Sequence, residues 1–185
     1  DSQLLEPAKY ITEKRKQFTN FLIPIFEKTY QKISSDQEKV SIEYKSKLLN
    51  IDFQELLLET REKDRILQRT TQGVHRDDWT FKINTYPVKK YASQGQLKSY
   101  VLALKLAQYE LLKQEKEVAP ILLLDDIFDK LDNDRVRELL ALLIREDFGQ
   151  IFITDTDENR IEKIIQLLEV DYKKFIIKDG QVVIG

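Results

Sequence analysis

Cysteine and methionine are both absent from these 185 residues, and histidine occurs only once. Without cysteine the chain can form neither disulfides nor cysteine-ligated metal sites, which suits a reducing compartment. The one histidine, His75, has no second histidine with which to make a metal pair. Long apolar runs are also missing, since no stretch reaches the roughly 20 residues that a membrane-spanning helix needs. The start of the chain does not resemble a signal peptide, and we therefore expect a cytoplasmic protein.

A phosphate-binding loop of the form GxxxxGK[ST] is the most informative absence. Such a loop supplies the backbone amides and the lysine that hold the β- and γ-phosphates of a nucleotide, and the sequence does not contain one. The chain also begins at Asp1 rather than at a methionine. We therefore expect a carboxyl-terminal piece of a longer product, whose other half carries the nucleotide cradle.

An acidic pair at the end of an apolar run is the strongest positive feature. The segment ILLLDD, residues 121–126, places Asp125 and Asp126 directly after four large apolar side chains. A parallel strand buried on both faces requires such a run, and ligands of open α/β sheets collect at the carboxyl ends of these strands. The pattern therefore predicts that the acidic pair handles a metal ion and phosphates.

A serine-glycine turn lies about one helix upstream, at Ser93, Gln94, Gly95 and Gln96. Residues 97–114 follow it with the spacing of one buried helical face, carried by Leu97, Val101, Leu104, Ala107 and Leu111. Ser93 and Gly95 precede this helix, so a hydroxyl, backbone amides and the positive helix end can grip an anion there. The order of turn, helix, strand and acidic pair indicates a nucleotide-hydrolysing protein.

The composition, with 42% hydrophobic and 34% charged residues, is that of a chain that can bury a core. Residues 1–69 read as a mainly helical arm, with an apolar stripe that Pro24 kinks or splits, a short strand at 40–44 and a helix at 52–68. The stripe comprises Tyr10, Ile11, Phe18, Phe21, Leu22, Ile25 and Phe26, and the second helix turns Phe53, Leu56, Leu57 and Ile66 inward.

Residues 70–185 read as a mixed α/β lobe. We predict strands at 79–83, 121–124, 150–154, 175–178 and 181–184, and helices at 97–114, 133–145 and 158–168. Asp132 or Asn133 caps the second of these helices. Asp179 and Gly180 suit a two-residue turn with positive φ, so the last two strands form a hairpin.

These motifs together resemble a known family. The turn SQGQ, the strand ILLLDD, the segment FDKLD at 128–132 and IFITDTD at 151–157 resemble the signature motif, Walker B strand, D-loop and switch region of ABC-type ATPases. The stretch TTQGVHRDDWTF at 70–81, with YASQGQ, LLLDD and FITDTD, resembles more narrowly the carboxyl-terminal half of the RecF family, recombination mediators related to SMC-type chromosome ATPases. The implied fold is the carboxyl-terminal lobe of an ABC-type ATPase, a P-loop NTPase-like sheet with flanking helices, joined to a helical arm and lacking the P-loop half.

The resemblance implies roles for individual residues. Asp125 would bind Mg²⁺ through water, and Asp126 would polarise the attacking water, although most ABC ATPases have a glutamate there that is one methylene longer. The turn Ser93, Gln94, Gly95 and Gln96 would face ATP held by a second subunit. Asp132 would be the D-loop acid at the dimer seam, and Thr156 stands where many ABC proteins place a switch histidine.

Each of these features also has a purely structural reading. Ser93 is explained by capping its helix, and so is Asp132. The acidic pair could cap the turn that follows the strand. Residues 80–114 hold six lysines against one acid, while 115–185 hold ten bases against seventeen acids, yet Lys89 and Lys90 could belong to a solvated face. We interpret His75, Arg76 and Asp77 as architecture that joins the arm to the lobe.

The resemblance implies a DNA-binding ATPase of recombinational repair, with ATP and Mg²⁺ as cofactors. It would form a homodimer on ATP, act on DNA with mediator proteins of the RecOR type, and load recombinase at gaps. This chain alone, without a Walker A loop, should neither bind ATP tightly nor hydrolyse it. The alternative is a non-catalytic interaction or scaffold module derived from an ABC-type ATPase, against which the intact acidic pair argues.

Overall fold

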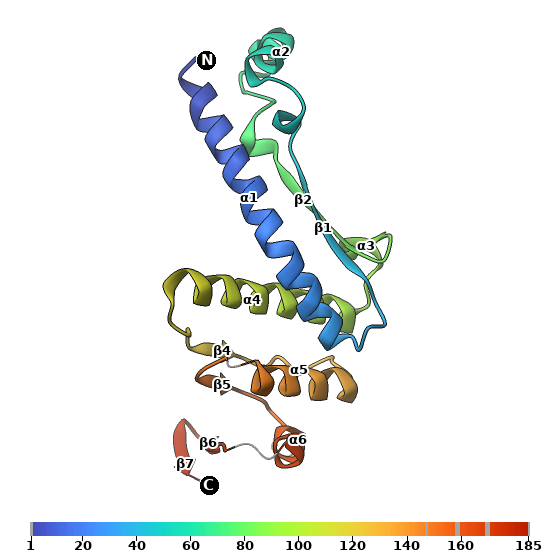
Figure 1. Ribbon diagram of the computed structural model, residues 1–185, viewed down its shortest axis with the longest axis vertical. Helices are drawn as coiled ribbons and strands as arrows, with labels where there is room; N and C mark the ends of the chain where they lie inside the picture. Colours follow the sequence, from blue (N-terminus) through green and yellow to red (C-terminus); the bar gives the residue numbers. More distant parts are fainter. Residues whose placement is uncertain (1, 147, 158–159, 169–170, 185) are drawn as a thin grey trace.

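Two parts of the chain differ in shape, a long arm and a smaller α/β lobe (Figure 1). The computed structural model describes residues 2–146, 148–157, 160–168 and 171–184. In the arm, α1 (Ser2–Ile33) runs beside a ribbon of two strands, β1 (Val40–Lys45) and β2 (Asp78–Ile83). Among the described residues, no helix has the length and apolar character to cross a membrane.

The arm ribbon is antiparallel, with Val40 opposite Ile83 and Lys45 opposite Asp78. Its alternation places Val40, Ile42 and Ile83 in the core, as expected for a half-buried pair of strands. The short β3 (Tyr86–Pro87) adds a third strand to β2, and α3 (Val88–Tyr91) follows it at once. The sequence had predicted the first two strands but neither β3 nor α3.

Pro24 does not divide the first helix. The helix α1 continues through Pro24 to Ile33, which excludes the predicted split, and the alternative of a kink stays a prediction. Proline removes one intrahelical hydrogen bond, which leaves the carbonyl of Asn20 without its helical donor. Because Asn20 lies at an exposed position, water can satisfy this carbonyl.

The predicted apolar stripe of α1 is only partly buried. Phe26 is fully buried, and Leu22 and Ile25 pack partly against the core. The side chains of Tyr10, Phe18 and Phe21 are exposed by 64%, 50% and 67%, so the prediction was wrong for these three. The arm is narrow there, and the ribbon covers only one side of the helix (Figure 1).

At the far end of the arm lies α2 (Phe53–Leu67), whose first turn is capped by Asp52. The Asp52 carboxylate accepts hydrogen bonds from the backbone N–H groups of Gln54 and Glu55. Leu56 and Leu57 are buried, as predicted. Ile66, which we expected to face inward, is 81% exposed in the last turn of the helix, beyond the reach of the arm core.

The predicted lobe started at residue 70, but its first strand, β2, pairs with β1 in the arm. The next long helix, α4 (Gln94–Lys116), crosses the base of α1 (Figure 1). The strands β4 (Leu122–Leu124) and β5 (Ile151–Ile153) pair in parallel, with Leu122 opposite Ile151. Between them α5 (Asn133–Arg145) provides the crossover, as a parallel connection requires. Both strands and both helices confirm the predicted order.

The face of α4 that forms the core agrees only in part with the predicted one. Ala107 is fully buried and Leu104 packs partly against the core, as predicted. Leu97 and Val101 are instead 46% and 44% exposed, and Tyr100, Ala103 and Leu106 are buried. The buried stripe is centred on Tyr100 because α1 places aromatic rings there. The rings of Phe26 and Tyr30 lie 4.7 and 5.7 Å from that of Tyr100. Aromatic packing has therefore determined the face of the helix that is buried.

The apolar strand β4 is buried on one face only. Leu122 and Leu124 are 8% and 4% exposed, but Ile121 and Leu123 are 61% and 71% exposed. The expectation that the strand is covered on both faces is therefore wrong for this chain. The described residues cover one face through α4 and α5, and no described element packs on the other.

The chain ends with α6 (Arg160–Leu168) and the hairpin of β6 (Phe175–Lys178) and β7 (Gln181–Ile184). Asp179 and Gly180 both have positive φ, 49° and 74°, as the predicted two-residue turn requires. The predicted helix start at 158–159 lies outside the described residues.

Candidate nucleotide site

The two acids follow β4 directly and both carboxylates are exposed. The hydroxyl of Thr154 donates a hydrogen bond to Oδ1 of Asp125 and accepts one from the backbone N–H of Asp126 at 3.1 Å. Thr154 stands at the end of β5, so pairing of the two strands brings it there. It thereby fixes the orientation of the Asp125 carboxylate and the backbone of Asp126.

The backbone of Asp126 is held from the opposite side by Lys98, whose Nζ donates to its carbonyl at 2.8 Å. Asp126 has a φ of 45°, which is uncommon for a residue other than glycine. Side chains from α4 and from the end of β5 therefore hold an unusual backbone conformation, while the carboxylate itself faces solvent. Neither Thr154 nor Lys98 was among the site residues that the sequence predicted.

The serine-glycine turn forms a capping box at the start of α4. Oγ of Ser93 accepts from the N–H of Gln96 at 3.2 Å, and the N–H of Ser93 donates to Oε1 of Gln96 at 2.8 Å. The structural reading of Ser93 as an N-cap is therefore confirmed. Ser93 and Gln94 remain exposed at the surface, so the turn is accessible to a second molecule.

Gly95 lies against the segment that follows the acidic pair. A Cβ built on Gly95 would meet the carbonyl oxygen of Lys130 at 3.2 Å, closer than nearly all real contacts of this kind. The absence of a Cβ thus lets the two backbones approach closely, because a larger residue would displace the Lys130 carbonyl by a few tenths of an ångström. The contact joins the turn to the predicted D-loop.

Asp132 caps α5, with its Oδ1 accepting from the N–H of Arg135 at 2.8 Å. The capping interpretation is again confirmed, while the D-loop role stays a prediction. Thr156, the predicted switch residue, is exposed in the loop after β5. In the same loop Oδ1 of Asp155 accepts from the N–H of Asp157 at 2.9 Å. The described contacts thus bring all the predicted motifs to one end of the lobe.

A partly buried ion pair contacts the turn, and the sequence did not predict it. Glu38, in the loop between α1 and β1, pairs with Arg135 at 2.9 Å, and their side chains are 12% and 14% exposed. Burial would raise the pKa of Glu38, but hydrogen bonds from Tyr30, Gln96 and Arg135 and the positive charge of Arg135 lower it below its usual value. The carboxylate is therefore ionised in the folded protein.

The same contacts act on Tyr30 and Arg135. Burial and the hydrogen bond to Glu38 raise the pKa of Tyr30. Burial opposes the charge of Arg135, but its hydrogen bonds to Glu38 and Tyr30 raise its pKa overall. Sequence patterns could not predict this cluster because 97 residues separate Glu38 from Arg135 along the chain.

Asp77 contacts residues of the arm and lies apart from the acidic pair in its contacts. Its carboxylate accepts from Arg15 of α1 at 2.7 Å and from the hydroxyl of Tyr44 of β1 at 2.6 Å, and its side chain is 1% exposed. His75 is exposed, with Nε2 lying 3.1 Å from the carbonyl of Thr70. These contacts agree with the architectural interpretation of Asp77, although its partners belong to the arm.

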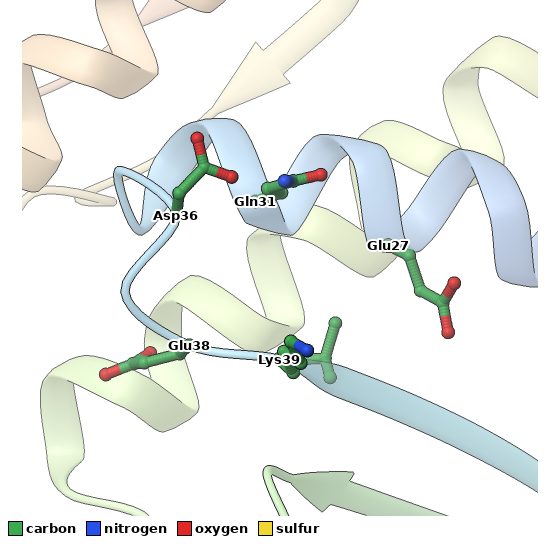
Figure 2. A pocket seen from close by; sticks show the side chains of 6 residues that line it. Glu27, Gln31, Asp36, Glu38 and Lys39 are labelled. Carbon is green, nitrogen blue, oxygen red and sulfur yellow. The ribbon is translucent and has the colours of Figure 1, made fainter.

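A hollow of about 290 Å³ lies at the base of the arm, lined by Glu27, Gln31, Asp36, Glu38, Lys39 and Val40. Figure 2 shows Gln31 on the last turn of α1, Asp36 in the turn that follows it, and Glu38 and Lys39 on the loop that leads into β1. Glu38 is thus shared between this hollow and the ion pair with Arg135. The hollow does not include the acidic pair.

The oxygen donors at the strand ends fit a hard cation. Mg²⁺ uses one or two carboxylates and keeps much of its hydration beside substrate phosphates, and Asp125 offers one exposed, oriented carboxylate. Among the described residues, no three acidic or histidine side chains gather into a metal cluster. The single carboxylate of Asp125 therefore fits the small number of protein ligands that Mg²⁺ uses.

Comparison with known proteins identifies first the class and then the family. No protein-family model matches the chain. A solved structure of an SMC ATPase, studied for ATP-driven dimerisation, covers 94% of the chain with a TM-score of 0.58 at 12% identity, which shows the fold alone. The fold is therefore that of the carboxyl-terminal lobe of an ABC-type ATPase.

Curated relatives narrow the class further. The chain is 46% identical over 182 residues to the DNA replication and repair protein RecF of Cytophaga hutchinsonii, and 47% identical over 175 residues to that of Flavobacterium johnsoniae. These matches cover 98% and 95% of the chain but 48% and 49% of the relatives. A solved structure of the recombination mediator RecF-ATPrS of the RecFOR pathway covers 98% of the chain and 48% of its own, with 30% identity and a TM-score of 0.72.

The chain belongs to the RecF family and corresponds to its carboxyl-terminal half. It thus spans about half the length of the curated relatives that it matches. A second solved RecF structure, RecF-ATP, covers the same 98% of the chain with a TM-score of 0.70.

Proposed function

We propose that this chain is the half of a RecF-type DNA-repair ATPase that supplies the signature turn, the Walker B acids and the D-loop. The observation that carries the proposal is the joining of three motifs at one end of the lobe. Lys98 of the signature helix holds the backbone of Asp126, and Gly95 packs on the carbonyl of Lys130. Ser93 and Asp126, which belong to two of these motifs, are both exposed to solvent.

Each residue then has a defined task. Asp125, oriented by Thr154, would hold Mg²⁺, which when bound neutralises charge on the β- and γ-phosphates. Asp126 would orient the attacking water. The N-terminus of α4, with Ser93, would contact the γ-phosphate of ATP held by a partner subunit, because an anion is stabilised at a helix N-terminus.

A dimer is expected because one protomer would supply the acids and its partner the signature turn. If the turn of one protomer contacts ATP bound to the other, ATP binds the closed dimer better than the open one, and this difference in affinity drives closure. Closure on DNA and reopening after hydrolysis would serve recombinase loading at gaps with RecOR-type mediators. The relatives' naming as DNA replication and repair proteins and the RecFOR description of a structural neighbour support this role.

The full-length protein tests the proposal through two substitutions. Ser93→Arg should leave ATP binding to the monomer intact and abolish the ATP-driven dimer in sizing chromatography, because the long side chain fills the space that the phosphate needs. Asp126→Asn should retain ATP and prolong the dimer. A Ser93→Arg protein that still dimerises with ATP, or an Asp126→Asn protein with unchanged hydrolysis, would support the scaffold alternative instead.

A further inference from the structure

The carboxylate of Glu38 has both oxygens engaged by groups from different parts of the fold. Oε1 accepts from Nε2 of Gln96 at 2.8 Å and from Nη2 of Arg135 at 2.9 Å, and Oε2 accepts from the hydroxyl of Tyr30. The four residues come from α1, the loop before β1, α4 and α5. One buried charge therefore joins the arm to both helices of the lobe edge.

Two of these partners belong to the first turns of their helices. Gln96 also accepts the N–H of Ser93 through Oε1, so a single side chain connects the backbone of the signature turn to Glu38. Arg135 lies 3.3 Å from Oδ2 of Asp132 through Nε, and its Nη1 donates to Oγ of Ser99 at 3.2 Å. The D-loop acid and the signature turn are thus tied to the same carboxylate.

The four side chains of this cluster restrain one another because removing one partner costs free energy. A partly buried ion that loses its partner keeps part of the penalty of desolvation, so the shared carboxylate restrains the fork of Arg135 and the amide of Gln96 together. A catalytic geometry needs placement within about 0.5 Å. Glu38 supplies such restraint for the turn and the D-loop at once.

We propose that Glu38 and Arg135 are positioning residues, which hold the turn Ser93 to Gln96 and the D-loop acid Asp132 in the arrangement that a partner's nucleotide requires. The inference rests on the proposed function and deepens it. Because Glu38 lies in the arm, between Ile33 and Val40, a displacement of the arm moves the anchor of both motifs. The arm thereby acts on the signature turn and the D-loop through the contacts of Glu38 with Gln96 and Arg135.

A matched ion pair separates this role from simple stabilisation. Lys32 and Glu146 also join α1 to α5, but their side chains are 36% and 40% exposed and neither contacts the turn. In the full-length protein, Glu38→Gln should leave ATP binding by the monomer unchanged, and lower ATP-driven dimerisation and kcat about tenfold, within the usual range of coupling between sites. Glu146→Gln should behave as the parent protein in all three measurements.

Arg135→Lys keeps the charge but loses the fork, so its loss of dimerisation should be smaller than that of Glu38→Gln. Thermal unfolding followed by circular dichroism reports whether each variant is folded. The positioning role is overturned if folded Glu38→Gln and Arg135→Lys proteins dimerise and hydrolyse ATP like Glu146→Gln. It is equally overturned if Glu38→Gln loses monomer ATP binding to the same degree as dimerisation.

Mixed dimers give the sharpest test, because the turn serves the partner whereas Asp126 serves its own protomer. A mixture of Glu38→Gln and Asp126→Asn proteins should hydrolyse more ATP than the two proteins measured separately, since one of the two sites in the mixed dimer is intact. Ser93→Ala mixed with Asp126→Asn should show the same gain. A gain with Ser93→Ala but none with Glu38→Gln would remove the positioning role alone, and no gain in either mixture would remove the proposed function as well.

Discussion

Two aspartates, each a member of an adjacent acidic pair in the sequence, have opposite surroundings in the fold. Asp77 in the arm is 1% exposed, and its carboxylate contacts Arg15 and Tyr44. At the lobe edge the protein instead holds the backbone of Asp126, through Lys98 and Thr154, and leaves the carboxylate in solvent. A carboxylate whose acceptor capacity is used by the protein stabilises the fold, whereas one that is held by its backbone can receive a ligand.

Glu38 combines the two situations. Like Asp77 it is buried and paired with an arginine, but its partners Gln96 and Arg135 continue into the motifs of the site. The comparison teaches that the burial of a charged pair does not by itself reveal its role. The partners of the pair decide whether its loss changes stability alone or also function.

The largest change in activity should come from substitution of Asp126, the exposed aspartate of the two. In the full-length protein, Asp126→Asn should lower kcat for ATP hydrolysis by about 10²–10⁴, the usual contribution of a positioned acid or base. The free energy of unfolding should change by less than about 0.5 kcal/mol, because the side chain is exposed. A large loss of stability in denaturant titration would show that the two aspartates do not differ in the proposed way.

Asp77→Asn should show the reverse pattern. Loss of the carboxylate weakens a charged hydrogen bond to Arg15, whose side chain is 34% exposed and still donates to the carbonyl of Val74. The free energy of unfolding should therefore fall by about 2 kcal/mol. Hydrolysis per folded molecule should be unchanged at a temperature well below the unfolding transition. A loss of kcat in folded Asp77→Asn protein would contradict the assignment of Asp77 to the arm alone.

The third prediction concerns pH and uses Glu38. Its pKa is lowered in the folded protein, so its contribution to stability is present above the unfolded glutamate pKa of about 4.3 and is lost as the pH falls through the folded value. The difference in the free energy of unfolding between the parent and Glu38→Gln proteins should be large at pH 7 and shrink below about pH 4. A difference that stays constant across this range would mean that the charge of Glu38 is not what stabilises the cluster.

The smallest effect should be at Asp132, which is both a helix cap and a neighbour of Arg135. Asp132→Ala removes the cap and should cost about 1 kcal/mol in the free energy of unfolding. Asp132→Asn keeps an oxygen that can accept from the N–H of Arg135, and asparagine and aspartate are about equally good N-caps. In thermal unfolding, its free energy of unfolding should therefore lie within about 0.3 kcal/mol of that of the parent protein. Equal losses in both variants would show that the charge, rather than the cap, carries the stabilisation.

Much of the secondary structure could be predicted because local signals set it. The hairpin at Asp179 and Gly180, the helix Asn133–Arg145 with its Asp132 cap, and the Ser93 cap all rest on residues within one turn of each other. These signals act over a few residues of sequence. The sequence is therefore sufficient to place the motifs in order.

Burial was harder to predict because it depends on distant partners. Tyr100 becomes the centre of the α4 face through contact with α1, and Leu123 is exposed because no described element covers that side of β4. Thr154 and Glu38 reach the site through strand pairing and through a contact across 97 residues. Periodicity shows that a helix has an apolar face, but only the tertiary fold decides the side that is buried.

The concentration dependence of hydrolysis tests the central claim, that the Ser93 turn of one protomer completes the site of another. Turnover per protomer of the full-length protein should rise with protein concentration, following dimer formation measured by light scattering in the same samples. Ser93→Ala should reduce the turnover that this rise reaches at saturation. The claim would be contradicted by appreciable turnover per protomer that does not change with concentration while light scattering finds only monomers in the presence of ATP.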